Sequence, residues 1–129
     1  MANARTYPAP AVTPETKPYW DAAAQGRLLV KRCTRCGEVH YYPRAICPFC
    51  LSDETQWQAS PGTGTVYSFS VMRRAPVPYA IAFVTLDEGV TMMTNIVDTD
   101  LDAIHIGQRV KVLFHPTDGG PPVPVFTPA

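Results

Sequence analysis

Short apolar runs with strand-like alternation dominate the second half of the chain. Five segments after residue 60 are rich in β-branched and aromatic residues and are bounded by turn residues such as Asp87-Glu-Gly89. Five such strands within about 65 residues favour a small closed barrel of the OB-fold type, a five-stranded Greek key. The connection over 98–107 is long enough for a short helical turn. The predicted strands are 65–72, 79–86, 90–97, 109–114 and 123–126.

One helical pattern lies near the start of the chain. The helix is predicted to lie between Thr16 and Gly26, with Thr13 or Thr16 as its N-cap, Pro18 tolerated in its first turn and Gly26 at its end. A helix of about ten residues is too short to be stable alone. We therefore expect Tyr19 and Trp20 to pack either on the rest of the chain or on a partner.

Two Cys-x-x-Cys pairs are the strongest chemical signal in the sequence. Ten residues separate the pairs, no other cysteine is present, and Gly37 can take the positive φ that a cysteine knuckle often needs. Two knuckles supply a tetrahedral site of four thiolates, and residues 39–42 can pair back toward 28–31 as in a zinc ribbon. The predicted metal ligands are Cys33, Cys36, Cys47 and Cys50.

The same cysteines allow more than one chemistry. A closed site of four thiolates has no open position for a substrate, so we interpret it as one structural Zn²⁺ site. Redox use of the pairs, or iron in place of zinc, remains an alternative that metal analysis separates. His40 is interpreted as a surface residue of the ribbon rather than as a ligand.

Composition narrows the class of protein. The 129 residues include 11 basic and 11 acidic side chains, so the formal net charge is zero and no overall positive field favours nucleic acid. No apolar run is long enough to cross a membrane. The first 14 residues lack the apolar stretch of a secretory signal, which favours a cytoplasmic protein with reduced cysteines.

Positive charge is nevertheless concentrated in one region. This cluster either offsets the charge of the metal site or forms a docking face for a phosphate-bearing cofactor or an acidic partner. Arg73 and Arg74, after the first barrel strand, are expected to extend such a face. The clustered residues are Arg27, Lys31, Arg32, Arg35 and Arg44, with Glu38 as the one acid among them.

Aromatic side chains in the ribbon and barrel have two interpretations. They are either platforms on which nucleic-acid bases stack or, for most of them, packing residues of the core, which we favour. We expect Tyr67 and Phe69 to share one face of the barrel wall. No spacing in the chain indicates a nucleophile and base, so no catalytic residue is assigned. The aromatic residues considered are Tyr41, Tyr42, Phe49, Tyr67, Phe69, Tyr79 and Phe83.

Motifs between residues 13 and 115 occur in a characteristic order. They are Pro18-Tyr-Trp20, Gly26-Arg-Leu28, Cys33-Thr-Arg-Cys-Gly37, Tyr42-Pro-Arg44, Cys47-Pro-Phe-Cys50, Gly64-Thr-Val-Tyr-Ser-Phe-Ser70, Pro78-Tyr-Ala-Ile-Ala82 and Ile106-Gly-Gln-Arg-Val110. Together they resemble a family of small bacterial and archaeal proteins, long catalogued as a domain of unknown function, that join a rubredoxin-like zinc ribbon to an OB-fold. The resemblance implies that the four cysteines bind zinc.

The resemblance also implies a role. Members of that family accompany thiolase-superfamily proteins, including aldolases and acyltransferases, as non-catalytic subunits that stabilise the partner or help to bind acyl-CoA. We expect the same of this chain, in a hetero-oligomer and without activity of its own. The alternative is a module that binds single-stranded nucleic acid.

A mainly β architecture in four parts follows. We expect a flexible tail over 1–13, a helix over 14–26, a zinc ribbon over 27–59 and an OB-fold domain with a proline-rich end over 60–129. Tyr19 and Trp20 are expected to contact the partner. The residues expected to meet CoA or the partner are Arg27, Arg35, Arg44, Arg73 and Arg74.

Overall fold

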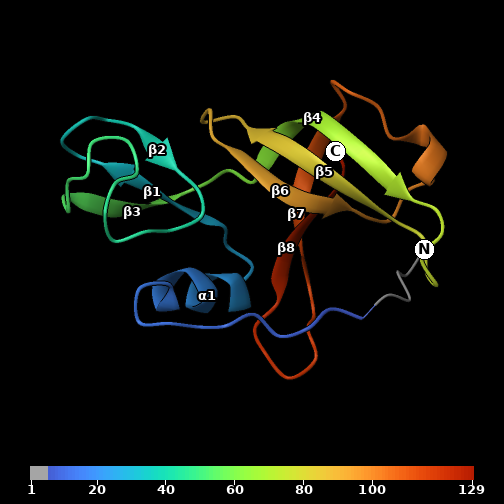
Figure 1. Ribbon diagram of the computed structural model, residues 1–129, viewed down its shortest axis with the longest axis horizontal. Helices are drawn as coiled ribbons and strands as arrows, with labels where there is room; N and C mark the ends of the chain where they lie inside the picture. Colours follow the sequence, from blue (N-terminus) through green and yellow to red (C-terminus); the bar gives the residue numbers. More distant parts are fainter. Residues whose placement is uncertain (1–5) are drawn as a thin grey trace.

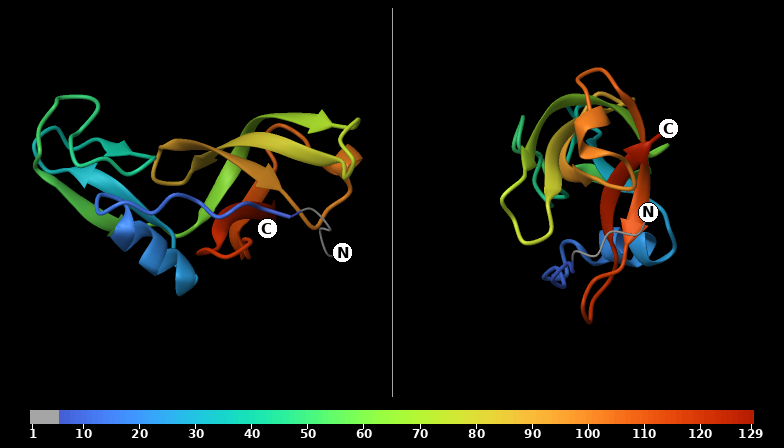
Figure 2. Two further views of the ribbon diagram at one scale, coloured as in Figure 1. Left: turned by 60° about the horizontal axis from the view of Figure 1, so that its bottom comes forward. Right: turned by 90° about the vertical axis from the view of Figure 1, so that its right-hand side faces the viewer.

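A short helix, a three-stranded sheet and a closed barrel follow one another along the chain. The structure, a computed structural model, describes residues 6–129. The ribbon sheet lies beside the barrel along the long axis of the molecule, and the helix lies beneath the ribbon (Figures 1 and 2). None of the described helices combines the length and the apolar character that crossing a membrane requires.

Helix α1 covers Lys17–Ala24 and confirms the predicted position. Thr16 is its N-cap residue, Pro18 lies in the first turn, and Gly26 takes a φ of +77° just after the end. The glycine allows the chain to turn away at no steric cost. The helix buries one face, which carries Tyr19, Trp20, Ala22 and Ala23.

The ribbon sheet has the strand order β2-β1-β3. Strands β1 (Leu29–Cys33) and β2 (Val39–His40) pair as predicted, with Lys31 opposite His40. Strand β3 (Thr55–Ala59) pairs with β1 along its whole length and was not predicted. The metal knuckles therefore extend from a sheet that the chain re-enters after the second cysteine pair.

The barrel closes in the order β4-β5-β6-β8-β7, which confirms the OB-fold prediction. Strands β6 and β8 pair in parallel, and the other neighbours are antiparallel. A short 3-10 turn, η1 (Leu101–Ala103), lies in the connection where a helical turn was expected. The strands are β4 (Thr63–Met72), β5 (Tyr79–Leu86), β6 (Thr91–Ile96), β7 (Arg109–His115) and β8 (Val123–Pro128).

A β-bulge in β4 changes the predicted face of one aromatic residue. Val66 pairs with Val84 and Ser68 pairs with Phe83, so Tyr67 is the extra residue and its side chain is 68% exposed. Val66 and Val84 face the core, whereas Phe83 is exposed. Core packing therefore does not explain Tyr67 or Phe83, contrary to the favoured interpretation of the sequence.

One apolar core joins the helix, the ribbon and the barrel. Tyr19 from α1 and Val30 from β1 belong to the same buried cluster as Val84 and Phe126 of the barrel. The two modules therefore share a common interior.

Part of the segment expected to be a loose tail packs on the barrel. Tyr7 is buried in a small cluster with Val97 and Val125, and Pro8 forms a bridge to Asp118. Residues 1–5, which belong to the same predicted tail, lie outside the described residues.

Candidate metal centre

The two cysteine knuckles have the same backbone hydrogen bonds. In the first, the N–H of Gly37 donates to the carbonyl oxygen of Cys33 at 2.9 Å; in the second, the N–H of Leu51 donates to that of Cys47 at 2.9 Å. The N–H of each leading cysteine also donates to a carbonyl five residues later, at 2.9 and 2.8 Å. These bonds fix both loops so that their sulfur atoms face the same point.

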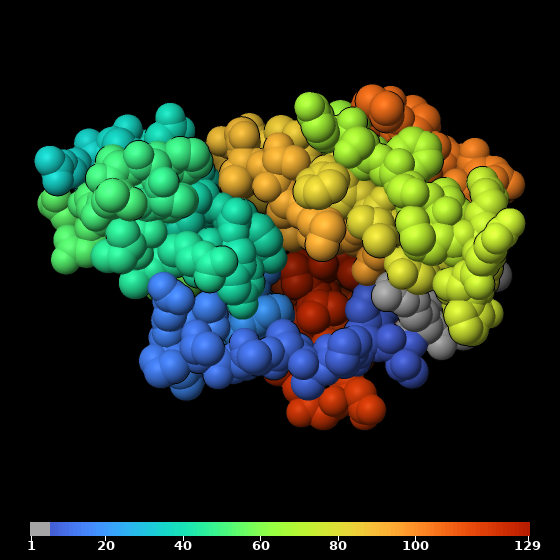
Figure 3. Space-filling view, in the orientation of Figure 1, coloured from blue at the N-terminus to red at the C-terminus, as the bar shows by residue number. Residues whose placement is uncertain are grey.

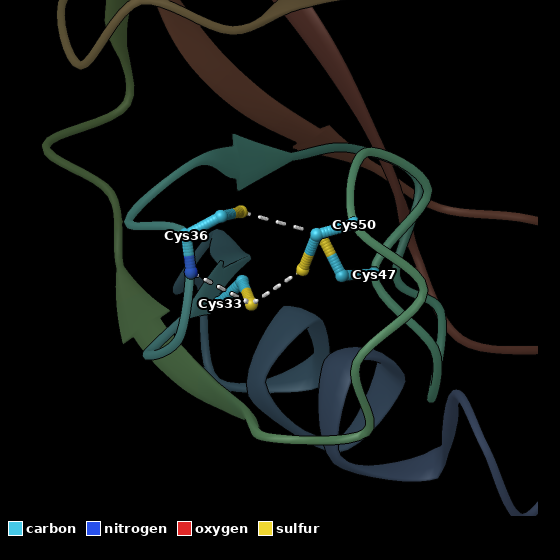
Figure 4. A group of neighbouring side chains, drawn as sticks. All are labelled: Cys33, Cys36, Cys47 and Cys50. Atoms are coloured by element: carbon cyan, nitrogen blue, oxygen red, sulfur yellow. Dashed lines mark hydrogen bonds between the residues drawn. The ribbon is translucent and has the colours of Figure 1, made fainter.

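The four predicted ligands are brought together. Their Sγ atoms all lie within 4.8 Å of one another (Figure 4). The Sγ atoms of Cys33 and Cys50 are 3.6 Å apart, and those of Cys36 and Cys47 are 3.7 Å apart. Zn–S bonds of about 2.3 Å in a tetrahedron place sulfurs about 3.8 Å from each other. The cluster therefore fits a tetrahedral four-thiolate metal site.

The surroundings of the sulfur atoms shift the pKa values of Cys33 and Cys36 in opposite directions. The backbone N–H of Cys36, which points at the sulfur 3.5 Å away, is the main reason that the pKa of Cys33 falls to about 7. The N–H of Glu38 lowers the pKa of Cys36, but burial and the neighbouring sulfurs outweigh it and raise that pKa to about 12. Four thiolates this close repel one another, so a bound cation is the natural way to keep all of them ionised.

His40 is buried, and its interpretation as a surface residue is wrong. Its side chain is 3% exposed, and its Nε2 accepts a hydrogen bond from the N–H of Arg44 at 3.3 Å. Burial lowers the pKa of His40. The group of possible metal ligands found among residues 6–129 consists of the four cysteines and does not include His40.

Two members of the basic cluster are engaged within the ribbon. Lys31 is 8% exposed, donates from Nζ to Thr55 at 3.2 Å and lies 4.5 Å from the ring centre of Trp57. Arg32 donates from Nε to Gln58 at 2.7 Å and from a terminal nitrogen to the carbonyl of Gly37 at 2.7 Å. Arg32 therefore stabilises the backbone of the first knuckle.

The five arginines predicted to meet CoA or a partner are all exposed but do not form one face. Arg44 lies over the ring of Tyr42 at 5.7 Å, and Arg27 donates to Gln25 at 3.2 Å. Arg73 and Arg74 follow β4, and the β4–β5 connection lies at the end of the barrel away from the ribbon (Figure 1). Arg73 forms an ion pair with Asp102 at 2.6 Å. The expected extension of the ribbon face by these two residues is therefore wrong.

Tyr19 and Trp20 pack within the chain rather than on its surface. The hydroxyl of Tyr19 lies 2.6 Å from that of Tyr41, and Nε1 of Trp20 donates to the hydroxyl of Tyr42 at 3.0 Å. The two side chains are 1% and 6% exposed, and burial raises the pKa of Tyr19. This packing gives no support to a partner-contacting role for the helix.

An apolar groove, missed by the sequence analysis, lies between the modules. It has a volume of about 400 Å³ and is bordered by Tyr7 of the N-terminal segment, Trp20 of α1 and the outer faces of β5, β6 and β8. None of its lining residues is charged. Figure 3 shows the hollow between the blue N-terminal segment and the barrel. The sequence gives no signal for this groove, because an apolar strand residue such as Met93 is normally expected to face the core and not the outside of the barrel.

Family matches cover both modules. Residues 20–56 match the family described as "ChsH2, rubredoxin-like zinc ribbon domain", and residues 57–115 match "ChsH2, C-terminal OB-fold domain". Together the two matches cover most of the chain.

Individual relatives are both longer proteins and proteins of similar size. A probable enoyl-CoA hydratase alpha subunit of Thermomonospora curvata is 35% identical over 95% of this chain. A DUF35 domain-containing scaffold protein of Methanocaldococcus jannaschii is 36% identical over 67% of each chain. The 3-oxo-4,17-pregnadiene-20-carboxyl-CoA hydratase alpha subunit of Mycobacterium tuberculosis is 30% identical over 81% of this chain. The chain spans 40% and 35% of the two hydratase subunits.

Solved structures have the same fold. A chain of the "Ltp2-ChsH2(DUF35) aldolase" superposes with a TM-score of 0.81 at 35% identity, covering 92% of this chain and 98% of the other. A DUF35 protein of unknown function from Sulfolobus solfataricus superposes with a TM-score of 0.66 at 13% identity and shares the fold. The chain therefore belongs to the ChsH2 (DUF35) family, whose members join a rubredoxin-like zinc ribbon to an OB-fold, as the motifs predicted.

Proposed function

We propose that the chain is a cytoplasmic, non-catalytic accessory subunit of a thiolase-superfamily enzyme that acts on acyl-CoA. The observation that carries this proposal is the likeness to the DUF35 chain of an aldolase complex, at 35% identity over nearly the whole length of both chains. The hydratase subunits among the relatives act on CoA thioesters by name, which supports the substrate class. In this role the chain stabilises its partner and helps to hold the acyl-CoA.

Zinc is the metal that the cysteine cluster fits best. We propose that Cys33, Cys36, Cys47 and Cys50 hold one Zn²⁺, which supplies structure and no reaction step because all four positions are taken by thiolates. Metal analysis of the purified chain is expected to give one zinc per chain. Visible iron absorption would contradict this assignment.

The exposed arginines of the ribbon are our candidates for the phosphates of CoA. Arg27, Arg35 and Arg44 are exposed, and a guanidinium presents a planar fork suited to phosphate oxygens. Reversing Arg35 and Arg44 to Glu is expected to weaken CoA binding in the complex at least tenfold, measured by calorimetry. Arg74→Glu, at the far end of the barrel, is the matched control. Unchanged affinity in the double variant would remove these residues from the proposal.

Co-purification tests the function itself. The tagged chain is isolated from its own host under gentle conditions, and the associated proteins are identified by mass spectrometry alongside a zinc assay. A stoichiometric thiolase-superfamily enzyme is expected. A zinc-loaded chain that is alone in every preparation would contradict the accessory role.

One observation favours a second candidate function, binding of single-stranded nucleic acid. Tyr67 and Phe83 are 68% and 44% exposed on neighbouring strands, and Phe83 lies on the second barrel strand, which with the third forms the face that binds oligonucleotides in OB-folds. Binding through phosphates would weaken steeply as salt is added. Absence of binding to mixed-sequence single strands at low salt would exclude this candidate.

A further inference from the structure

The two cysteine knuckles differ at the residue that follows the second cysteine. That residue is Gly37 in the first knuckle, with a φ of +79°, and Leu51 in the second, with a φ of +64°. Both backbones lie in the left-handed region, where glycine is at ease and a branched side chain is strained. A Cβ built on Gly37 would meet no atom within 4 Å, so backbone conformation alone, and not space, favours glycine there.

The Leu51 side chain buries little surface within the chain that could offset this strain. It is 77% exposed, which is more than any other large apolar side chain among residues 6–129. Phe49 and Ile46 of the same loop are 63% and 46% exposed. We call these three residues the knuckle tip. Backbone strain at Leu51 opposes folding, and a side chain that stays exposed gains no burial to offset it; such features are typical of functional sites.

We propose that the knuckle tip is an apolar anchor that inserts into a recess of the catalytic partner, an inference that rests on the proposed function. Apart from the two metal-site cysteines, residues 46–51 contain no ionisable side chain, so the tip suits an apolar protein surface rather than a phosphate backbone. Phe49 is the one ring of the tip on which a base could stack, whereas Leu51, its most exposed member, and Ile46 offer none. Together with the lack of a cation to hold a phosphate, this favours a protein contact over a nucleic-acid contact.

The loop is built to hold such an anchor in place. The N–H of Leu51 donates to Cys47 at 2.9 Å, and the N–H of Cys47 donates to the carbonyl of Ser52 at 2.8 Å. The N–H of Phe49 points at the sulfur of Cys47, 3.4 Å away. A loop already fixed by these bonds and by its two sulfurs loses little conformational freedom on binding, which favours affinity.

Two substitutions of Leu51 separate binding from folding. Leu51→Gly removes the side chain and relieves the backbone, and Leu51→Asn keeps a residue that tolerates the left-handed region but is polar. Both variants are expected to retain one zinc and an unfolding midpoint no lower than that of the wild type. Both, and Phe49→Ala, are expected to bind the partner at least tenfold more weakly by surface plasmon resonance. The probe is the thiolase-superfamily enzyme that co-purifies with the wild type.

Two control variants test whether a loss of affinity is specific to the knuckle tip. Tyr67→Ser removes an exposed aromatic ring of the barrel and is expected to leave the affinity unchanged. Gly37→Leu, the converse change in the first knuckle, is expected to lower the unfolding midpoint. Wild-type affinity in Leu51→Asn and Phe49→Ala overturns the anchor while leaving the accessory role intact. A wild-type chain that binds no such enzyme overturns both, and a wild-type dimer that Leu51→Asn makes monomeric assigns the tip to self-association instead.

Discussion

Gly64 of β4 lies where strand β5 leaves no room for a side chain. A Cβ at this position would come within 2.6 Å of the carbonyl oxygen of Thr85 and 2.8 Å of a methyl group of Val84. Backbone atoms of a paired strand cannot move aside cheaply, so Gly64→Ala is expected to lower the free energy of unfolding by about 1–3 kcal/mol. Urea denaturation checks this, with Ser70→Ala on the exposed side of the same strand as the control. An unchanged midpoint for Gly64→Ala would mean that the barrel closes less tightly here.

Asp87 and Arg109 tie the β5–β6 turn to β7 at the protein surface. Two guanidinium nitrogens of Arg109 donate to the two carboxylate oxygens at 2.8 and 3.0 Å, and the Thr63 hydroxyl also donates to Asp87. The bonds from Arg109, and then that from Thr63, lower the pKa of Asp87 from 3.8 to about 2.

This pair predicts an acid-dependent contribution to stability. Because the pKa is lower in the folded state, the pair stabilises the fold above the ordinary pKa of 3.8, and this contribution is lost as the pH falls toward about 2. Asp87→Asn is therefore expected to be less stable than the wild type at neutral pH, with a difference that shrinks between about pH 4 and pH 2 and vanishes below pH 2. The difference in urea midpoint between the two proteins, followed against pH, measures this. Loss of zinc in acid affects both proteins alike, and a difference that does not shrink between pH 4 and pH 2 would exclude the pair as its source.

The exposure or burial of some single residues could not be predicted from the sequence. The spacing of the four cysteines is local, so the metal cluster could be predicted without knowing the fold. The exposure of Tyr67 depends on a bulge, which is set by the register with β5 and leaves no local signature. The burial of His40 depends in the same way on residues far from it in sequence. The left-handed backbone of Leu51 could have been found by comparing the two knuckles, since Gly37 occupies the same place.

Helix α1 is held to the ribbon by paired aromatic side chains. Trp20 donates to the Tyr42 hydroxyl, and the rings of Tyr19 and Tyr42 meet edge to face at 5.5 Å between centres. The helix has only eight residues and depends on these contacts for its stability. The hydrogen bond therefore matters for an entire element.

Removing the Tyr42 hydroxyl tests how far helix α1 depends on its hydrogen bond with Trp20. Tyr42→Phe leaves Nε1 of Trp20 buried without its acceptor and is expected to cost about 1–3 kcal/mol of unfolding free energy. Trp20→Phe combined with Tyr42→Phe is expected to cost less than the sum of the single changes, because neither polar group is then left unpaired. Thermal unfolding of the four proteins completes the cycle. Strict additivity would contradict the hydrogen bond.

The strands with a distinct apolar pattern were predicted correctly, and the strand with a weak pattern was not. The five barrel strands alternate β-branched and aromatic residues between clear turns, and all five were placed correctly. Strand β3, with the sequence Thr-Gln-Trp-Gln-Ala, is polar at alternate positions and only half-buried, so it lacked the apolar run that identified the others. Its place in the ribbon comes from pairing with β1, a contact between distant parts of the chain.

Ribbon and barrel are joined through one apolar core, and this couples the metal to the whole molecule. Leu28 and Val30 of the ribbon region belong to the same buried cluster as Val66 and Val110 of the barrel. Structural zinc contributes about 10–16 kcal/mol in small zinc domains. Loss of the metal is therefore expected to weaken the barrel as well as the ribbon.

Metal removal measures this coupling. Treatment with a zinc chelator under reducing conditions is expected to lower the unfolding midpoint recorded from the barrel, and re-addition of Zn²⁺ is expected to restore it. The conservative variant Cys36→Ser is expected to behave like the chelated wild type. A barrel transition that stays at the same midpoint after chelation would show two independently stable modules.

The shared interior was also beyond the reach of the sequence. Apolar residues in α1 and the ribbon predict that those elements pack on something, but only the assembled chain shows that the barrel provides part of that surface. The groove beside Tyr7 arises in the same way, because its walls come from the N-terminal segment, the helix and three barrel strands. Such features belong to the arrangement of modules and not to any one stretch of residues.

The arrangement of the sulfurs also decides what becomes of a chain that loses its metal in air. The close pairs, Cys33 with Cys50 and Cys36 with Cys47, each join one knuckle to the other. Oxidation would therefore form two nested cross-links between the knuckles rather than a small ring within each Cys-x-x-Cys. A chain sealed in this way keeps its loops together but has no thiolate left to offer a metal. A zinc ion held as proposed would therefore also protect the ribbon from oxidation, because the same four sulfurs would be withheld from the oxidant while it is bound.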